Sequence, residues 1–182
     1  MNYRRWVFVA VAIFAIGLVL GLATPSGIAG LISEEITLLE ELGGILAPSS
    51  IFTLVFILIN NVVAVLVSFF LSPILCLMPI LSLTINGCLL SFVAASVAQE
   101  ESIGFVLAAL LPHGIVELPA LIMAQAAALS FGAMAMMALV KKEKRKLLLP
   151  NFKKNLRYLL IALALLVLAA IIETYVTPLL LQ

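Results

Sequence analysis

The chain has 182 residues, of which 65% are hydrophobic and only 10% are charged, and its formal net charge is +1. This composition excludes an ordinary soluble domain, and several apolar runs exceed the roughly 18 residues that mark a membrane-spanning helix. Because nearly the whole chain lies in such runs, no room is left for a soluble catalytic domain. We therefore expect a single integral membrane domain, residues 1–182, folded as an all-α, polytopic transmembrane helical bundle.

The small net charge hides a segregation of basic residues along the sequence. All ten lie in two places, at Arg4 and Arg5 and between Lys141 and Arg157. Because Lys and Arg in short flanking loops stay on the cytoplasmic side, both places are expected at the inner face of the cell (plasma) membrane. With about five full spans, this predicts a cytoplasmic N-terminus and a C-terminus outside.

The first predicted span covers residues 6–24 and carries two glycines four positions apart. Gly17 and Gly21 have the GxxxG spacing that lets another helix approach closely, within the subunit or across a homodimer. After this span, apolar residues and glutamates mix at helical spacing over residues 28–42, which favours an amphipathic helix on the outer surface. A solvated loop fits that segment nearly as well.

Two further spans are predicted at residues 50–71 and 74–97. Both carry amide side chains near their midpoints: Asn60, Asn61 and Asn86. Adjacent amides on a helix point about 100° apart, so at least one of the first two is expected to bond to a neighbouring helix. Structural bonding between helices and a ligand site would use the same residues.

The next apolar run, residues 103–140, is too long for one span, which needs about 20 residues, and too short for two spans with a turn. We expect a half-helix at residues 103–111, re-entrant or interfacial, followed by a full span over residues 113–140. The residues expected to break the helix are Pro112, Gly114 and Pro119. If the full helix begins at the second proline, the backbone between the two prolines would be irregular.

This run also contains the only histidine, His113, four residues before Glu117. An ionisable side chain at membrane depth costs roughly 3 kcal/mol on insertion scales, so it needs a protein partner. Glu173 is expected at a similar depth near the outer end of the last span. The predicted polar intramembrane site therefore comprises His113, Glu117, Glu173, Asn60, Asn61, Asn86 and Gln125.

Small residues follow the ionisable pair along the same helix. At 100° per residue, one narrow stripe holds His113, Glu117, Ala120, Ala124 and Ala128. Small side chains at four-residue spacing permit close helix contact. We therefore expect this stripe to face protein and not lipid.

The basic segment 141–157 is predicted to form a cytoplasmic hairpin that turns at Pro150 and Asn151. Anchoring to anionic lipid head groups explains its charge better than nucleic-acid binding, which we do not expect. The last span then covers about residues 158–176.

The decapeptide Leu-Pro-His-Gly-Ile-Val-Glu-Leu-Pro-Ala at residues 111–120 resembles the signature of the stage II sporulation protein M family. Asn60-Asn61 and Asn86-Gly87 also fall where that family has asparagine and Asn-Gly, so the likeness covers roughly residues 50–140. The resemblance implies a small multi-pass membrane protein. The family's founding role is in a membrane complex with peptidoglycan-degrading enzymes during spore engulfment.

Enzymatic chemistry finds little support in the sequence. A catalytic zinc site usually needs three protein ligands, and the chain has no second histidine, so neither a metal nor another cofactor is expected. No Gly-x-Ser-x-Gly motif is present. An intramembrane hydrolase would need an outer serine to meet His113 through the fold. Cys76 and Cys88 are interpreted as small packing residues.

Two functions remain open. The first is a non-enzymatic scaffold or assembly protein of the cell envelope, similar to the sporulation engulfment component, acting in the lipid bilayer with other envelope membrane proteins and as a homo-oligomer such as a dimer. The alternative is a transporter or permease-like component that moves a small solute, an ion or a lipid through the polar site at His113 and Glu117, because broken helices with polar midplane residues are typical of transporters.

Overall fold

The computed structural model describes residues 2–23, 50–100 and 103–180. The amphipathic helix predicted for residues 28–42 lies outside these residues. Within them the secondary structure is helical and contains no strand. The elements are α1 (Tyr3–Leu22), α3 (Ile51–Leu71), α4 (Leu77–Glu100), α5 (Ile103–Val140), the 3-10 helix η1 (Lys142–Leu147), α6 (Leu148–Tyr175) and α7 (Thr177–Leu180).

Five segments of the described chain are long and apolar enough to cross a membrane, so the predicted all-α polytopic bundle is confirmed. They are Tyr3–Leu22, Ile51–Leu71, Leu77–Gln99, Gly114–Val140 and Lys142–Leu179. The outer faces carry large exposed apolar side chains such as Phe8 and Phe52. Such faces suit a hydrocarbon environment, in which helices satisfy their own backbone hydrogen bonds.

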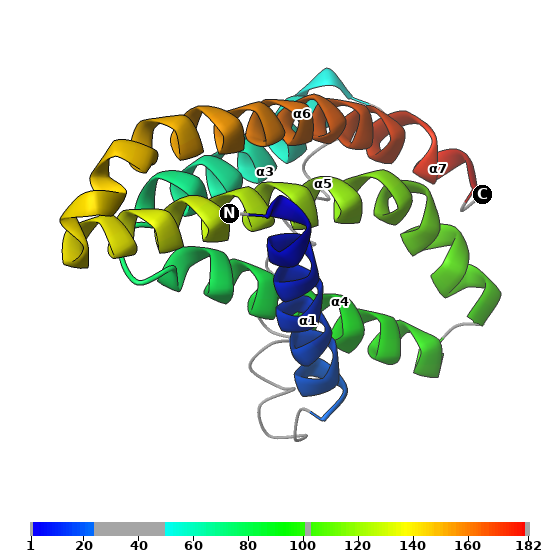
Figure 1. Ribbon diagram of the computed structural model, residues 1–182. Coiled ribbons are helices and arrows are strands. Elements are labelled where there is room, and N and C mark those ends of the chain that lie inside the picture. The colour runs from blue at the N-terminus through cyan, green and yellow to red at the C-terminus, as the bar shows by residue number, and fades with distance from the viewer. Residues whose placement is uncertain (1, 24–49, 101–102, 181–182) are drawn as a thin grey trace.

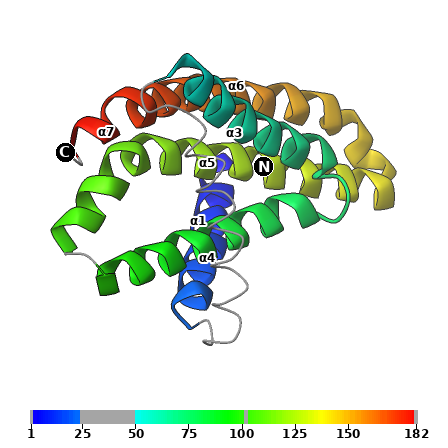
Figure 2. The ribbon, with the colours of Figure 1, turned by 180° about the vertical axis from the view of Figure 1, so that it is seen from behind.

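Helix α5 forms the centre of the bundle. It packs against α1, α3, α4 and α6, and its longest contact is with α6. In Figure 1, α6 and α3 lie along one side of α5 and α4 lies along the other, and the reverse view in Figure 2 agrees. Of the apolar window in α5, 61% is buried, against 17% to 33% in the other four spans. A side chain on α5 is therefore the one best placed to meet several helices at once.

Local sequence signals start two of the helices. The side chain of Asn2 accepts a hydrogen bond from the backbone N–H of Arg4, and the Ser50 hydroxyl oxygen accepts one from the N–H of Phe52. Asn and Ser are favoured at this position because they satisfy one of the free N–H groups of the first turn. These caps mark where α1 and α3 begin.

The closest approach between α1 and α4 depends on glycine. A Cβ atom added to Gly17 would collide with the backbone oxygen of Thr84, and one added to Gly87 would collide with the backbone oxygen of Phe14. Gly21 meets the Cys88 backbone in the same way. The GxxxG pair thus packs against another helix of the same subunit, and Gly87 on α4 makes the corresponding close contact with α1.

The alanine stripe of α5 lies in the core. Ala120, Ala124 and Ala128 have at most 1% of their surface exposed and belong to the main apolar cluster. Helix α6 also contributes small buried residues, Ala162 among them. Small side chains on both partners let the α5 and α6 backbones lie close together.

The prediction of a helix break before the full span is wrong in one respect. Residues 103–140 form one continuous helix through Pro112, Gly114 and Pro119, so the backbone between the two prolines is not irregular. Each proline removes one N–H donor and crowds the preceding turn, which bends a helix without ending it. Accordingly, the first part of α5 curves away from the rest toward the end of α4 (Figures 1 and 2).

The predicted cytoplasmic turn at Pro150 and Asn151 is also wrong. The chain turns earlier, in η1, and α6 begins at Leu148. Pro150 fits the first turn of α6 because its missing N–H would have no partner there. Asn151 is buried, and its backbone and side-chain oxygens each accept a hydrogen bond of 2.9 Å from Nδ2 of Asn155. The last helix therefore starts about three turns before the predicted residue 158.

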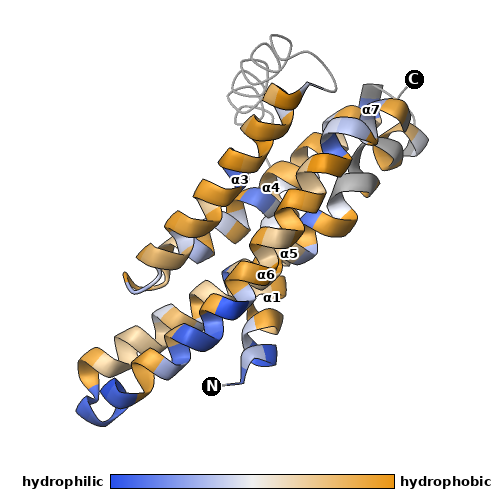
Figure 3. Cartoon of the chain, turned by 90° about the horizontal axis from the view of Figure 1, so that it is seen from above, coloured by the Kyte–Doolittle hydropathy of each residue, from blue (hydrophilic) through white to orange (hydrophobic). Residues whose placement is uncertain are grey.

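The hairpin of α5 and α6 extends beyond the turn between α3 and α4. A Cβ atom on Gly132 would collide with the backbone oxygen of Ser72, which places the α3–α4 turn beside that point of α5. Helix α5 continues for eight residues to Val140, or about 12 Å. Figure 3 shows the hydrophilic residues concentrated at the tip of this hairpin and at the nearby start of α1.

Cys76 closes the α3–α4 turn. It and Leu75 have φ angles of 54° and 53°, in the left-handed region. The buried Cys76 Sγ lies 3.8 Å from the backbone oxygen of Leu129, toward which it donates a weak hydrogen bond. Burial raises the pKa of the Cys76 thiol, which keeps it protonated near neutral pH. This environment suits a packing residue.

Candidate intramembrane polar site

Glu117 and Gln125 are polar residues in the central part of helix α5. They are eight residues apart, which separates them by about 12 Å along the helix axis. Each meets polar residues of neighbouring helices, but in different surroundings. We describe them as the Gln125 level and the Glu117 level.

The Gln125 level is the more deeply buried of the two, since Gln125 and Ser68 have at most 2% of their surface exposed. Gln125 is fully buried and its oxygen Oε1 accepts a hydrogen bond of 2.5 Å from the hydroxyl of Ser68 on α3. Its Nε2 donates a 2.9 Å hydrogen bond to the hydroxyl oxygen of Ser82 on α4. One side chain thus joins three helices. A buried amide that lacked these bonds would destabilise the fold, so the network also favours a single helix arrangement.

The Glu117 level is only partly buried. Asn61 on α3 donates a hydrogen bond of 3.3 Å from Nδ2 to Oε1 of Glu117. Both side chains keep part of their surface accessible. Of the two adjacent amides, Asn61 is the one bonded across helices, whereas Asn60 is exposed on the surface of α3.

A groove of about 230 Å³ lies beside Glu117, between α4 and α5. Its polar lining residues are Glu117 and Asn86, and Gly114 and Leu121 line it as well. Asn86 is exposed, and its Nδ2 donates a 2.7 Å hydrogen bond to the backbone oxygen of Ser82. Since one water molecule occupies about 30 Å³ in the liquid, the groove can hold several waters or a side chain.

Glycine keeps this groove open. Among the described side chains, a Cβ added to Gly114 would meet only Cδ1 of Leu118, at the ordinary contact distance of 3.8 Å. Gly114 therefore does not serve close helix packing, unlike Gly17 and Gly21. Its small size leaves space beside Glu117.

Two residues of the predicted site, His113 and Glu173, are not assigned to the Glu117 level. The side chain of His113 lies outside the described part of the structure, although its backbone belongs to α5. Glu173 is partly buried on α6, beside the buried Thr174. A meeting of His113, Glu117 and Glu173 stays a prediction.

The two serines that bind Gln125, Ser68 and Ser82, were not predicted from the sequence. One signal was available, because Ser68 follows Asn61 by seven residues, or two helical turns, and so shares its face of α3. Ser82 likewise precedes Asn86 by one turn. Without the pairing of the helices, these hydroxyls could not be told from serines that bond to their own backbone.

Among the residues that the structure describes, no three His, Cys, Asp or Glu side chains gather into a group that could hold a metal ion. The described groups at the Glu117 level are one carboxyl group and the amides of Asn61 and Asn86, all of which form hydrogen bonds. Such groups can bind a polar side chain, water or a small polar solute.

Comparisons with known proteins agree with the motif at residues 111–120. The family model described as stage II sporulation protein M matches residues 8–178. An uncharacterized protein of Methanocaldococcus jannaschii is 30% identical over 99 residues, which are 54% of this chain and 56% of that protein. The aligned region thus spans little more than half of that relative. No solved structure matches the chain significantly. Because the family match covers nearly the whole sequence, the chain belongs to the stage II sporulation protein M family.

Proposed function

We propose that this protein is a non-enzymatic scaffold of the cell envelope that binds a transmembrane helix of a partner protein at the Glu117 groove. One observation carries the proposal: the polar side chains of Asn86 and Glu117 line a groove on the outside of the bundle, among large exposed apolar side chains such as Leu89. At the Gln125 level, by contrast, the carboxamide is fully buried and bonds within the chain.

The apolar environment of the membrane favours binding of a partner helix at such a groove. An exposed amide in a hydrocarbon environment lacks water, so a hydrogen bond from another helix is favourable. Measured interhelical hydrogen bonds in membranes contribute on average about 0.6 kcal/mol and at most about 2 kcal/mol. Two or three polar contacts can therefore select a partner, while apolar packing supplies the rest of the affinity.

The rigidity of the surrounding bundle supports the same role. The Gln125 network joins α3, α4 and α5, and the glycine contact holds α1 against α4. These contacts fix both walls of the groove. A preorganised groove binds a helix with less loss of conformational entropy than a mobile one.

The proposed partners are other membrane proteins of the envelope or a second copy of the chain. Family membership supports the first, because the stage II sporulation protein M family is named after a sporulation protein. The concentration of basic residues at the tip of the α5–α6 hairpin and at the start of α1 supports a cytoplasmic placement of that end in the cell membrane.

Site-specific photo-crosslinking in native membranes tests the proposal. A photoreactive amino acid at Leu89, an exposed residue that lines the groove, should give a protein adduct. The same amino acid at Leu160, exposed on α6 away from the groove lining, serves as the matched control and should not. Asn86→Leu should reduce the Leu89 adduct by roughly threefold or more, as expected for the loss of one interhelical hydrogen bond.

The transporter alternative makes a different prediction for the same groove. It requires flux of a solute in proteoliposomes that depends on Glu117, with no protein adduct at Leu89. Adducts of equal yield at Leu89 and Leu160 would instead indicate nonspecific crowding, and the groove would lose its assigned role.

A further inference from the structure

A second surface feature lies at the basic end of the molecule, away from the Glu117 groove. An apolar groove of about 610 Å³ runs between the start of α1 and the end of α5. Its lining residues are Trp6, Ala133, Met136, Met137, Val140 and Lys141. A volume of this size falls within the roughly 300–1,000 Å³ typical of small-molecule sites.

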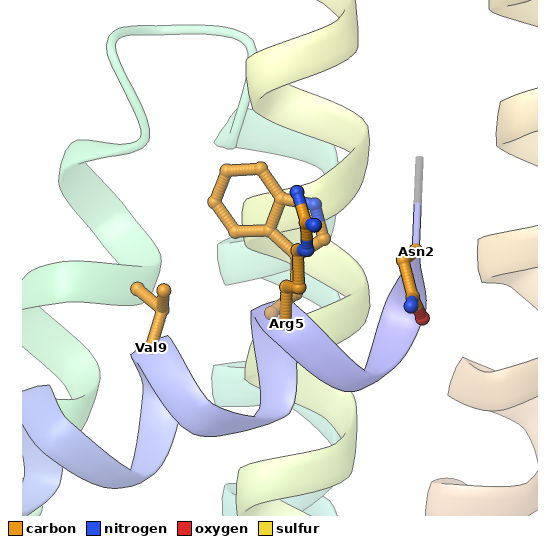
Figure 4. A pocket seen from close by; sticks show the side chains of 4 residues that line it. Asn2, Arg5 and Val9 are labelled. Carbon is orange, nitrogen blue, oxygen red and sulfur yellow. The ribbon is translucent and has the colours of Figure 1, made fainter.

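A smaller pocket of about 240 Å³ adjoins this groove. It is lined by Asn2, Arg5, Trp6 and Val9, so Trp6 belongs to both spaces. Figure 4 shows this pocket, with Asn2, Arg5 and Val9 along the first turns of α1. One end of the apolar groove is therefore bordered by Lys141, and the pocket beside it by Arg5.

The charge around this region is strongly one-sided. Arg4, Arg5, Lys141 and Lys142 are exposed, and Glu143 is the only acidic residue between positions 141 and 157. Arg145 is engaged elsewhere, because its Nε donates a 3.2 Å hydrogen bond to the backbone oxygen of Ala138. The cations that border the groove are thus complementary to a negatively charged ligand.

We propose that the Trp6 groove binds one anionic phospholipid, with its phosphate between Arg5 and Lys141 and an acyl chain along Met136 and Met137. Three features fit this ligand together: an apolar channel, cations at its mouth and a tryptophan between them. Tryptophan is enriched at membrane interfaces because its ring is apolar and its N–H is polar. Methionine suits a flexible acyl chain because its side chain adapts to irregular shapes.

Such a lipid would bridge α1 and α5 at the basic end. Helix α1 reaches this region only through its first turns, since its later glycines pack against α4. An anionic headgroup held by Arg5 of α1 and by Lys141, which directly follows α5, would connect both helices to a single ligand. The site differs from diffuse attraction of the hairpin to the membrane, because it depends on two particular cations and a defined groove.

Trp6 is the only tryptophan in the chain, which makes the site directly measurable. The purified full chain is reconstituted into phosphatidylcholine nanodiscs that contain a minor fraction of brominated lipid, and quenching of Trp6 fluorescence is recorded. Brominated phosphatidylglycerol should quench with an apparent affinity roughly five- to tenfold higher than brominated phosphatidylcholine, given the attraction expected from two basic side chains.

Matched variants separate a site from general electrostatic attraction. Arg5→Gln/Lys141→Gln should abolish the preference for phosphatidylglycerol, whereas Lys146→Gln/Lys153→Gln, which removes the same charge outside the groove lining, should retain it. Ala133→Phe should weaken quenching by both lipids by filling the groove. Each variant is first checked for an unchanged melting temperature, and if Ala133→Phe melts earlier it is replaced by Met137→Phe.

Three outcomes would overturn the proposal. Equal quenching by the two lipids in the wild type would show that no anionic headgroup is selected. An equal loss of preference in both double variants would reduce the effect to the total charge of the basic end. Retention of the preference in Arg5→Gln/Lys141→Gln would likewise exclude these residues as the phosphate ligands.

Discussion

The two polar levels of α5 differ in what encloses them. At Gln125, the carboxamide is fully buried and bonds to one serine on each of two neighbouring helices. At Glu117, the carboxyl group receives a hydrogen bond from Asn61 but also lines a groove that opens beside Asn86. Both levels lie on one helix about 12 Å apart, so the difference does not arise from their secondary structure.

This comparison separates two uses of polar residues inside a membrane protein. An enclosed hydrogen-bond network fixes how helices pack, because any other arrangement would leave its members unpaired. A polar group on the outside leaves bonding capacity for something beyond the chain. We therefore expect substitutions at Gln125 to act mainly on stability and substitutions at Glu117 to act mainly on binding.

The largest effect on stability is expected from Gln125→Ala. The change removes two hydrogen bonds and leaves a cavity, so the free energy of unfolding should fall by about 2–4 kcal/mol. Gln125→Met keeps most of the volume and removes only the hydrogen bonds, so it should lose about 1–2 kcal/mol. Thermal or chemical unfolding in one fixed detergent measures both. If the two variants are equally stable, packing does not contribute, and if neither is destabilised, the network is dispensable.

A smaller effect is expected from Ala124→Leu, next to Gln125 on the buried alanine stripe. Only 1% of the Ala124 surface is exposed, so three extra carbon atoms would overpack the core and lower stability by about 1–3 kcal/mol. Ile115→Ala, at an exposed apolar position of the same helix, is the control and should change stability little. An unchanged melting temperature for Ala124→Leu would place that face of α5 in a looser environment than the structure gives it.

Much of the fold could be predicted from the sequence because membrane spans depend on length and apolar composition alone. The predicted spans 6–24, 50–71, 74–97 and 113–140 each overlap a helix of the structure. Local sequence signals did not predict where helices bend or end, because tertiary packing also determines these positions. α5 continues through Pro112, because a proline removes one N–H donor and bends a helix without necessarily ending it. The true turn in η1 lies in a basic segment with no proline or glycine.

The candidate site was predictable only in part, for a similar reason. Rare polar residues in apolar runs pointed to Asn61, Asn86, Glu117 and Gln125, because burying such groups requires partners. Which of them bond to each other depends on helix pairing, which the sequence pattern does not contain. The serines of the Gln125 level are ordinary residues in a span until α3 and α4 are placed against α5.

The smallest effect on stability, and the sharpest contrast with Gln125, is expected from Glu117→Gln. The glutamine oxygen can still accept the hydrogen bond from Asn61, so the free energy of unfolding should change by less than about 0.5 kcal/mol. Function should nevertheless be lost if the partner or solute recognises the charge. Glu117→Leu should reduce both stability and function, because it leaves the Asn61 amide without its acceptor. Melting temperature and the Leu89 photo-adduct, measured on the same membranes, distinguish the two effects. Wild-type adduct formation and normal complementation of a deletion strain by Glu117→Gln would show that the charge is dispensable, and the Glu117 level would then resemble the Gln125 level in serving helix packing alone.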